Sequence, residues 1–198
     1  MPQKKKPSSL SALSNTRKFN ENPFNVVSTT ESRIPSSIED LILDKYTDFC
    51  YNSDTEDLES NQLFGFLKNY LKIPDVLLQG FNPTRYQIDG ETNVVDIDKL
   101  VKYGGLLLIM KNNLEIIKSY WKLLVKYMSD DFNLQNDKEV FEFKIHLDDL
   151  MKLRDSINDD SNENALIDMI AVGSDGEKVF VNFVDFGKIL GKIGELNF

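Results

Sequence analysis

The 198-residue sequence predicts an all-α protein, because apolar residues recur at helical spacing along most of the chain and very little of it has the pattern of a strand. Hydrophobic residues make up 41% of the chain, which is enough to form a buried core. Short polar loops rich in Asp, Asn, Ser and Gly separate the helical segments. No apolar run approaches the roughly 20 residues that a membrane span requires.

The first segment, residues 1–35, is rich in Ser, Asn, Thr and Lys and has little apolar periodicity, which predicts a disordered tail. Six basic and two acidic residues give this segment a net charge of +4, so the rest of the chain carries −13. A body this acidic should repel the phosphates of nucleic acids and suit a basic segment of a partner protein. Lys4–Lys6 fit either a fragment of a nuclear import signal or a solvated charge cluster.

The first predicted helix begins after Ser36 and Ser37, with acidic residues in its first turn. Its apolar residues follow one face, at Ile38, Leu41, Ile42, Tyr46 and Phe49. Similar stripes predict further helices over residues 63–71, 75–79, 100–110, 114–128, 147–157, 166–172 and 183–193.

Four of the loops end in the same way, with an apolar residue that precedes the start of an apolar helix by a fixed number of positions. The four leading residues are Leu58, Val95, Ile145 and Val181. They are 37, 50 and 36 residues apart, and this spacing indicates an internal repeat.

The repeated loop resembles the EF-hand, in which the eighth loop residue is apolar and the twelfth is a calcium-binding Glu. In EF-hand pairs the eighth residues join in a short antiparallel bridge, so we expect Leu58 to pair with Val95 and Ile145 with Val181. The twelfth positions here hold Gln62, Lys99, Asp149 and Asp185. No loop keeps a dense set of calcium ligands or the Gly at position six, so we expect no calcium and no other cofactor.

The C-terminal stretch 178–196 is similar to the end of a fungal, centrin-like family of nucleotide-excision-repair proteins that partner the XPC-type damage-recognition subunit. Residues 42–46, 95–101 and 106–114 also resemble that family. The resemblance implies a calmodulin/centrin-like fold with four degenerate EF-hand units in two lobes. With the tail at 1–35, the lobes would span 36–112 and 113–198. It also implies a nuclear protein that acts in DNA repair and is not an enzyme.

The resemblance further implies that the C-terminal lobe grips a partner. An EF-hand lobe takes up an amphipathic helix in an apolar groove between its own helices. We expect the groove to hold a helix of the XPC-type protein, with the acidic surround favouring basic residues on that helix. The expected lining residues are Leu124, Met128, Leu150, Met151, Ile170, Phe183, Phe186, Ile189 and Leu190. Each of these residues also fits a place in the core of the lobe.

The sequence holds one His and one Cys, His146 and Cys50, and nothing in it predicts catalytic or metal-binding residues. We therefore expect an adaptor that binds neither nucleic acid directly nor a membrane, located in the nucleus or also in the cytoplasm. Two alternatives stay open within the same fold. One is a centrin-like or light-chain-like subunit of an mRNA-export, spindle-pole or myosin assembly, and the other is a calcium sensor.

Overall fold

A computed structural model describes residue 24 and residues 34–89, 92–128, 136–157 and 162–198. The described residues are mostly helical and include two strands of two residues each, which confirms the all-α prediction. The elements in order are α1 (Ser36–Ser53), α2 (Ser60–Asn69), η1 (Asp75–Leu78), η2 (Pro83–Tyr86), α3 (Ile97–Lys99), η3 (Leu100–Gly104), α4 (Gly105–Asn112), α5 (Leu114–Met128), α6 (Asp137–Glu142), β1 (Ile145–His146), α7 (Leu147–Ile157), α8 (Glu163–Ser174), β2 (Phe180–Val181) and α9 (Phe183–Lys192).

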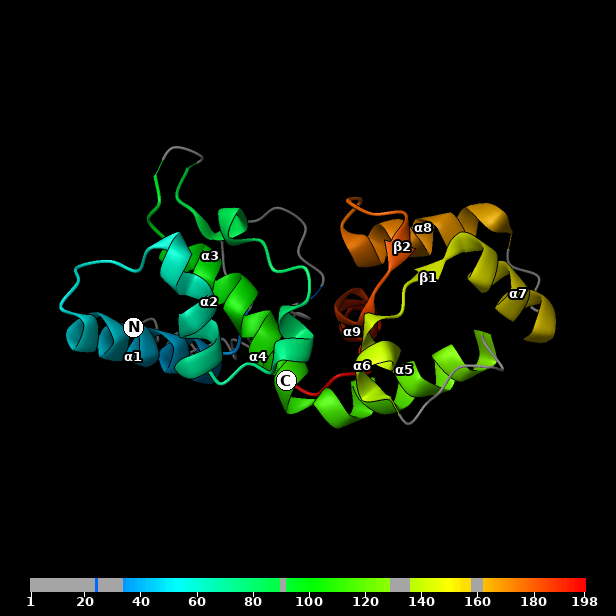
Figure 1. Ribbon diagram of the computed structural model, residues 1–198, viewed down its shortest axis with the longest axis horizontal. Coiled ribbons are helices and arrows are strands. Elements are labelled where there is room, and N and C mark those ends of the chain that lie inside the picture. Colours follow the sequence, from blue (N-terminus) through cyan, green and yellow to red (C-terminus); the bar gives the residue numbers. More distant parts are fainter. Residues whose placement is uncertain (1–23, 25–33, 90–91, 129–135, 158–161) are drawn as a thin grey trace, which may run out of the picture.

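The helices form two groups along the long axis of the molecule. Figure 1 shows α1–α4 on one side and α5–α9 on the other, with the chain crossing from α4 into α5. The groups touch where α9 lies against η1 and α4. The buried apolar side chains form one continuous cluster with members from both groups, so the two halves share a core.

Local sequence sets the helix ends. Glu59 and Gln62 form a capping box at the start of α2, and Asn182 and Asp185 form another at the start of α9. In each box the two side chains bind backbone N–H groups that the helix leaves unpaired. Helix α8 ends at Ser174, and the next residue, Asp175, has a left-handed backbone conformation. These ends are set by residue types that the sequence displays directly.

The predicted helix over residues 100–110 is divided into three parts. The helical stretch begins three residues earlier than predicted, as α3, passes through the π-helical turn η3 and continues as α4. A π turn inserts an extra residue and rotates the helix beyond it. Gly105 lies at the junction, where a Cβ would come within 2.8 Å of the Ile34 side chain. The sequence did not predict η2 or α6.

The four leading apolar residues pair as expected. Ile145 lies opposite Val181 in the antiparallel pair formed by β1 and β2. In the other half the Val95 N–H donates to the carbonyl of Leu58 at 2.9 Å, next to a bridge between Glu59 and Val94. The two pairs therefore tie together loops that are 36 and 37 residues apart in the sequence.

Most of the predicted tail, residues 1–35, lies outside the described residues. Phe24 and Ile34 are described, and both side chains are buried. Buried contacts with the helical body therefore reach N-terminal of Ser36. Within the described ranges, no helix has the length and apolar character needed to cross a membrane.

Replacing Gly191 with Ala is expected to destabilise the protein by about 1–2 kcal/mol, because a Cβ there would lie 2.5 Å from the ring of Phe24. The crowded atoms belong to an aromatic ring that is itself buried, so the ring has to move. Urea unfolding measures the loss. The double variant Gly191→Ala, Phe24→Ala should show a smaller effect of the glycine replacement, and strictly additive losses would contradict this contact.

Candidate functional site

An apolar groove of about 370 Å³ lies between α5 and α9. It is lined by Tyr120, Leu123, Leu124, Tyr127, Phe186, Leu190, Ile193 and Glu195. Glu195 is the single charged side chain in this lining. We expected acidic residues around the groove, and the lining contains one. The lining is suited to an apolar surface with few charges.

Helix α5 presents two apolar stripes on different faces. The stripe of Ile117, Trp121 and Val125 is buried in the core. The second stripe consists of Ile116, Tyr120, Leu123 and Tyr127, and all four side chains are exposed. Their spacing of 4, 3 and 4 residues places them along one side of the helix. A row of exposed apolar groups along one side of a helix is a candidate surface for interaction.

The floor of the groove is held by aromatic contacts. The Trp121 indole N–H donates to the carbonyl of Val140 at 2.7 Å, which fixes the ring. Its ring centre lies 5.9 Å from that of Phe183 and 5.4 Å from that of Phe186. Phe183 also lies 4.9 Å from Phe141. Because these rings come from α5, α6 and α9, they fix the two walls of the groove relative to each other.

The structure distributes the nine residues expected in the groove over three environments. Leu124, Phe186 and Leu190 line the groove, and the fully buried Phe183 contacts the aromatic residues of its floor. Leu150 and Ile170 are buried in the core. The remaining three, Met128, Met151 and Ile189, are partly buried.

Ile189 faces α8, because a Cβ added to Gly173 would lie 2.7 Å from its Cδ1 atom. Sequence reasoning missed Tyr120, Leu123, Tyr127 and Ile193, which supply much of the exposed lining. The second apolar stripe on α5 could have identified three of these residues, but the prediction used the stripe that contains Trp121.

In the fourth repeated loop, a lysine side chain binds the carboxylate of the residue at the twelfth position. The Lys178 Nζ lies 3.0 Å and 2.8 Å from the two oxygens of Asp185, whose side chain is 1% exposed. The same carboxylate accepts a bond from the Asn182 N–H at 3.3 Å. The ammonium group therefore contacts both oxygens of the carboxylate, which is the contact that a calcium ion makes with a bidentate ligand.

A lysine also binds within the second loop, but here the lysine is the twelfth-position residue. Lys99 is itself the residue at the twelfth position, and its Nζ contacts the carbonyl oxygens of Gln87 at 2.5 Å and Ile88 at 3.5 Å. The Lys99 ammonium group therefore binds backbone carbonyls at the start of the second loop. Across the described residues, no group of three or more His, Cys, Asp or Glu side chains is arranged to hold a metal ion.

In the first and third loops the twelfth-position side chains act as helix caps. The Glu59 N–H donates to Gln62 Oε1 at 3.1 Å, and the His146 N–H donates to Asp149 Oδ2 at 3.0 Å. All four twelfth-position side chains are therefore bound to groups of the chain itself.

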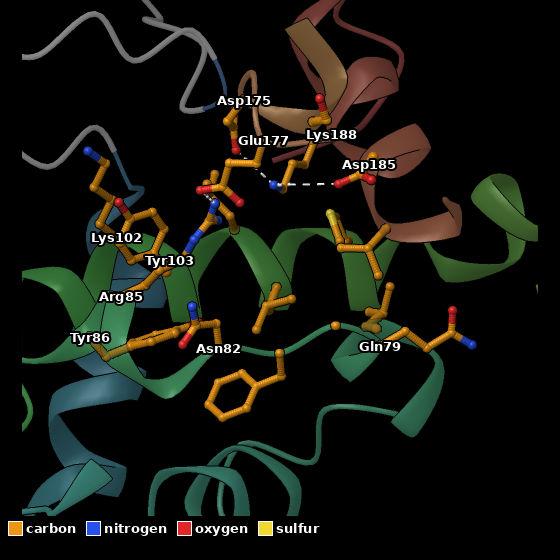
Figure 2. A pocket seen from close by; sticks show the side chains of 18 of the residues that line it. Gln79, Asn82, Arg85, Tyr86, Lys102, Tyr103, Asp175, Glu177, Asp185 and Lys188 are labelled. Atoms are coloured by element: carbon orange, nitrogen blue, oxygen red, sulfur yellow. Dashed lines mark hydrogen bonds and ion pairs between the residues drawn. The ribbon is translucent and has the colours of Figure 1, made fainter. Parts of the chain in front are cut away.

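A second, larger cavity of about 750 Å³ lies where the two groups of helices meet, and we call it the central cavity. Figure 2 shows the Arg85 side chain of the first group extending toward Glu177 of the second group, with Lys188 nearby. Lys102 also lines the cavity but lies to one side of these residues. Arg85 and Glu177 form an ion pair across it. This pair lowers the pKa of Glu177 and raises that of Arg85.

The pKa of Asp175, on the wall of the central cavity, lies below its ordinary value of 3.8. Partial burial acts to raise it, but the ion pairs with Lys188 at 2.9 Å and Lys192 at 3.4 Å outweigh burial. Because folding lowers this pKa, the stabilisation that Asp175 provides is present above its unfolded-state pKa. It is lost as the pH falls through the native pKa.

Replacing Lys188 with Met should therefore raise the pKa of Asp175, since it removes the nearer of the two cations. The change can be followed by NMR titration of the Asp175 carboxyl carbon. The matched variant Lys45→Met removes a lysine that pairs with Asp48 on α1, and it should leave the titration of Asp175 unchanged. An unchanged pKa in the Lys188 variant would contradict the assigned cause.

Comparisons with known proteins place the chain in a family. The profile of the Rad33 family matches residues 83–162, which span η2 to α7 and the residues beyond it. The chain is 31% identical over 164 residues to the DNA repair protein RAD33 of Saccharomyces cerevisiae, and the match covers 83% of this chain and 89% of the relative. No solved structure matches the chain. An identity of this level over nearly the full length of both sequences shows that the chain belongs to the Rad33 family.

Proposed function

We propose that this chain is a non-catalytic adaptor of nucleotide excision repair that binds and stabilises an XPC-type damage-recognition protein in the nucleus. The observation that carries the proposal is the apolar groove between α5 and α9, in a chain related to a protein named for DNA repair. The groove offers shape and apolar surface for binding.

We further propose that the chain has a calmodulin/centrin-like fold with four degenerate EF-hand units. Two features support this assignment. The leading apolar residues pair as Leu58 with Val95 and Ile145 with Val181. A lysine ammonium group also binds in two of the loops: that of Lys99 binds a backbone carbonyl, and that of Lys178 binds Asp185. Such loops need no calcium, so partner binding should persist when calcium is removed.

An amphipathic helix is the occupant that this groove suits best. Its walls are two helices whose apolar residues are fixed from beneath by Trp121, and the row of Ile116, Tyr120, Leu123 and Tyr127 extends the surface along α5. A partner helix with apolar residues at positions i, i+3 or i+4, and i+7 can lie along such a row. Binding would stabilise that segment of the partner, because the groove binds its helical form and so shifts the segment away from its unfolded form.

The test is to tag the protein in its own cell, purify it with calcium chelated and identify the proteins that come with it. We expect the XPC-type damage-recognition subunit in stoichiometric amount. Recovery of an mRNA-export scaffold, a spindle-pole filament or a myosin heavy chain in its place would keep the fold and overturn the function. Binding that requires added calcium would overturn the role given to the lysine-closed loops.

A further inference from the structure

The central cavity carries an excess of positive charge in an acidic protein. Its lining includes six cationic side chains, Arg85, Lys99, Lys102, Lys178, Lys188 and Lys192. Three carboxylates, Asp175, Glu177 and Asp185, lie among them. The lining therefore has an excess of three positive charges, whereas the whole chain has a net charge of −9.

The three carboxylates are already bound. Glu177 pairs with Arg85, and Asp185 is held through both oxygens by Lys178. Asp175 pairs with Lys188 and Lys192. The excess charge therefore lies with cations that these carboxylates do not neutralise.

Lys99 and Lys102 contribute most directly to this excess. Lys99 contacts two neutral carbonyl groups, which orient its ammonium but leave its charge uncompensated. Lys102 lies 5.5 Å from the centre of the Tyr103 ring and has no carboxylate partner among the described residues. The two lysines are three residues apart in the sequence, and both line the cavity.

The walls of the cavity also include apolar and aromatic side chains. Phe81, Tyr103, Leu106 and Met110 lie on the side of the first group, and Val184 lies on the side of α9. A cavity with these walls and a cationic rim is suited to a ligand that combines apolar and anionic groups. Its volume of about 750 Å³ fits a short peptide segment and excludes a nucleic acid duplex.

We infer that the central cavity binds an acidic peptide segment of a partner, in which carboxylates flank an apolar side chain. Charge complementarity supports this occupant, because carboxylates would pair with Lys99 and Lys102 while the apolar residue contacts Tyr103 and its neighbours. This site is distinct from the groove between α5 and α9, so one chain can contact two segments at once.

The inference can be tested with a synthetic peptide of glutamates around a central phenylalanine, titrated into the full-length protein at low salt. Two-dimensional NMR detects even weak binding, and we expect the amide signals of Lys102, Tyr103 and Glu177 to shift. Lys102→Glu should weaken binding at least tenfold. Lys126→Glu on α5 makes the same change in net charge outside the cavity, and it should alter binding less than twofold.

Three outcomes would overturn the inference. One is the absence of shifts at these signals when the peptide is present in large excess. Another is an equal loss of binding in the Lys102 and Lys126 variants, which would indicate attraction to the molecule as a whole. The third is that a single-stranded oligothymidylate shifts the same signals and binds more tightly than the peptide, which would show that the cavity binds nucleic acid.

Discussion

Replacing Lys178 with Met should lower the free energy of unfolding by about 2–3 kcal/mol. The change leaves the Asp185 carboxylate, 1% exposed, without its bidentate cation. Breaking a fully buried ion pair by removing one partner costs about 3–5 kcal/mol, and two features reduce this cost here. Lys178 is 27% exposed, and Lys188 lies 3.9 Å from the same carboxylate. Urea unfolding followed by circular dichroism measures the change.

The matched control is Lys152→Met in α7. Lys152 lies 3.8 Å from Asp149, the twelfth-position residue of the third loop, but its side chain is 72% exposed. Solvent weakens such a pair, so this replacement should cost less than about 0.5 kcal/mol. Comparable losses from both replacements would show that burial of Asp185 does not control the contribution of Lys178.

Replacing Tyr127 with Asp should weaken binding of the partner recovered by affinity purification at least tenfold. Tyr127 lines the groove and is 67% exposed, so it offers ring surface to a partner while contributing little to the core. Aromatic residues of this kind often dominate binding energy. A carboxylate there also places a charge beside the apolar walls, which a bound helix would have to desolvate. Calorimetric titration with the partner measures the effect.

Tyr51→Asp provides the matched control for this replacement. Tyr51 is also an exposed tyrosine near the end of a helix, and it lies on α1 in the other half of the molecule. Both replacements put a negative charge near a helix C-terminus, so their effects on helix stability should be similar. We expect the Tyr51 variant to bind normally. An equal loss of partner affinity in the two variants would show that the groove is not part of the binding surface.

The helical stripes predicted most of the elements because a core-facing stripe repeats in the sequence with the period of the helix. Helices α5 and α7 have the bounds that the stripes indicated, residues 114–128 and 147–157. The π turn at η3 was not predictable in this way, because an apolar stripe of helical spacing does not show where an extra residue is inserted. Helix α6 was not predicted, because it falls in the stretch expected to form the third repeated loop, which has Asp149 at its twelfth position.

The candidate site was predicted in part. The repeats, together with their resemblance to the EF-hand, were sufficient to pair Ile145 with Val181. Leu124, Phe186 and Leu190 were predicted as groove residues and line the groove, whereas Leu150 and Ile170 are buried. Periodicity identifies an apolar face, but only the positions of the neighbouring helices determine which residues of that face stay open. The central cavity depends on contacts between residues about 90 positions apart, such as Arg85 and Glu177, which no local pattern reveals.

The lysine in the fourth loop has a consequence for regulation. A free ion occupies its site only as far as its concentration in the cell allows, so a loop that binds one responds to every rise and fall of that ion. The Lys178 ammonium is tethered seven residues from Asp185, and its effective concentration at the carboxylate is high and constant. We therefore expect the state of this loop to be set when the chain folds and not to follow changes in cellular calcium.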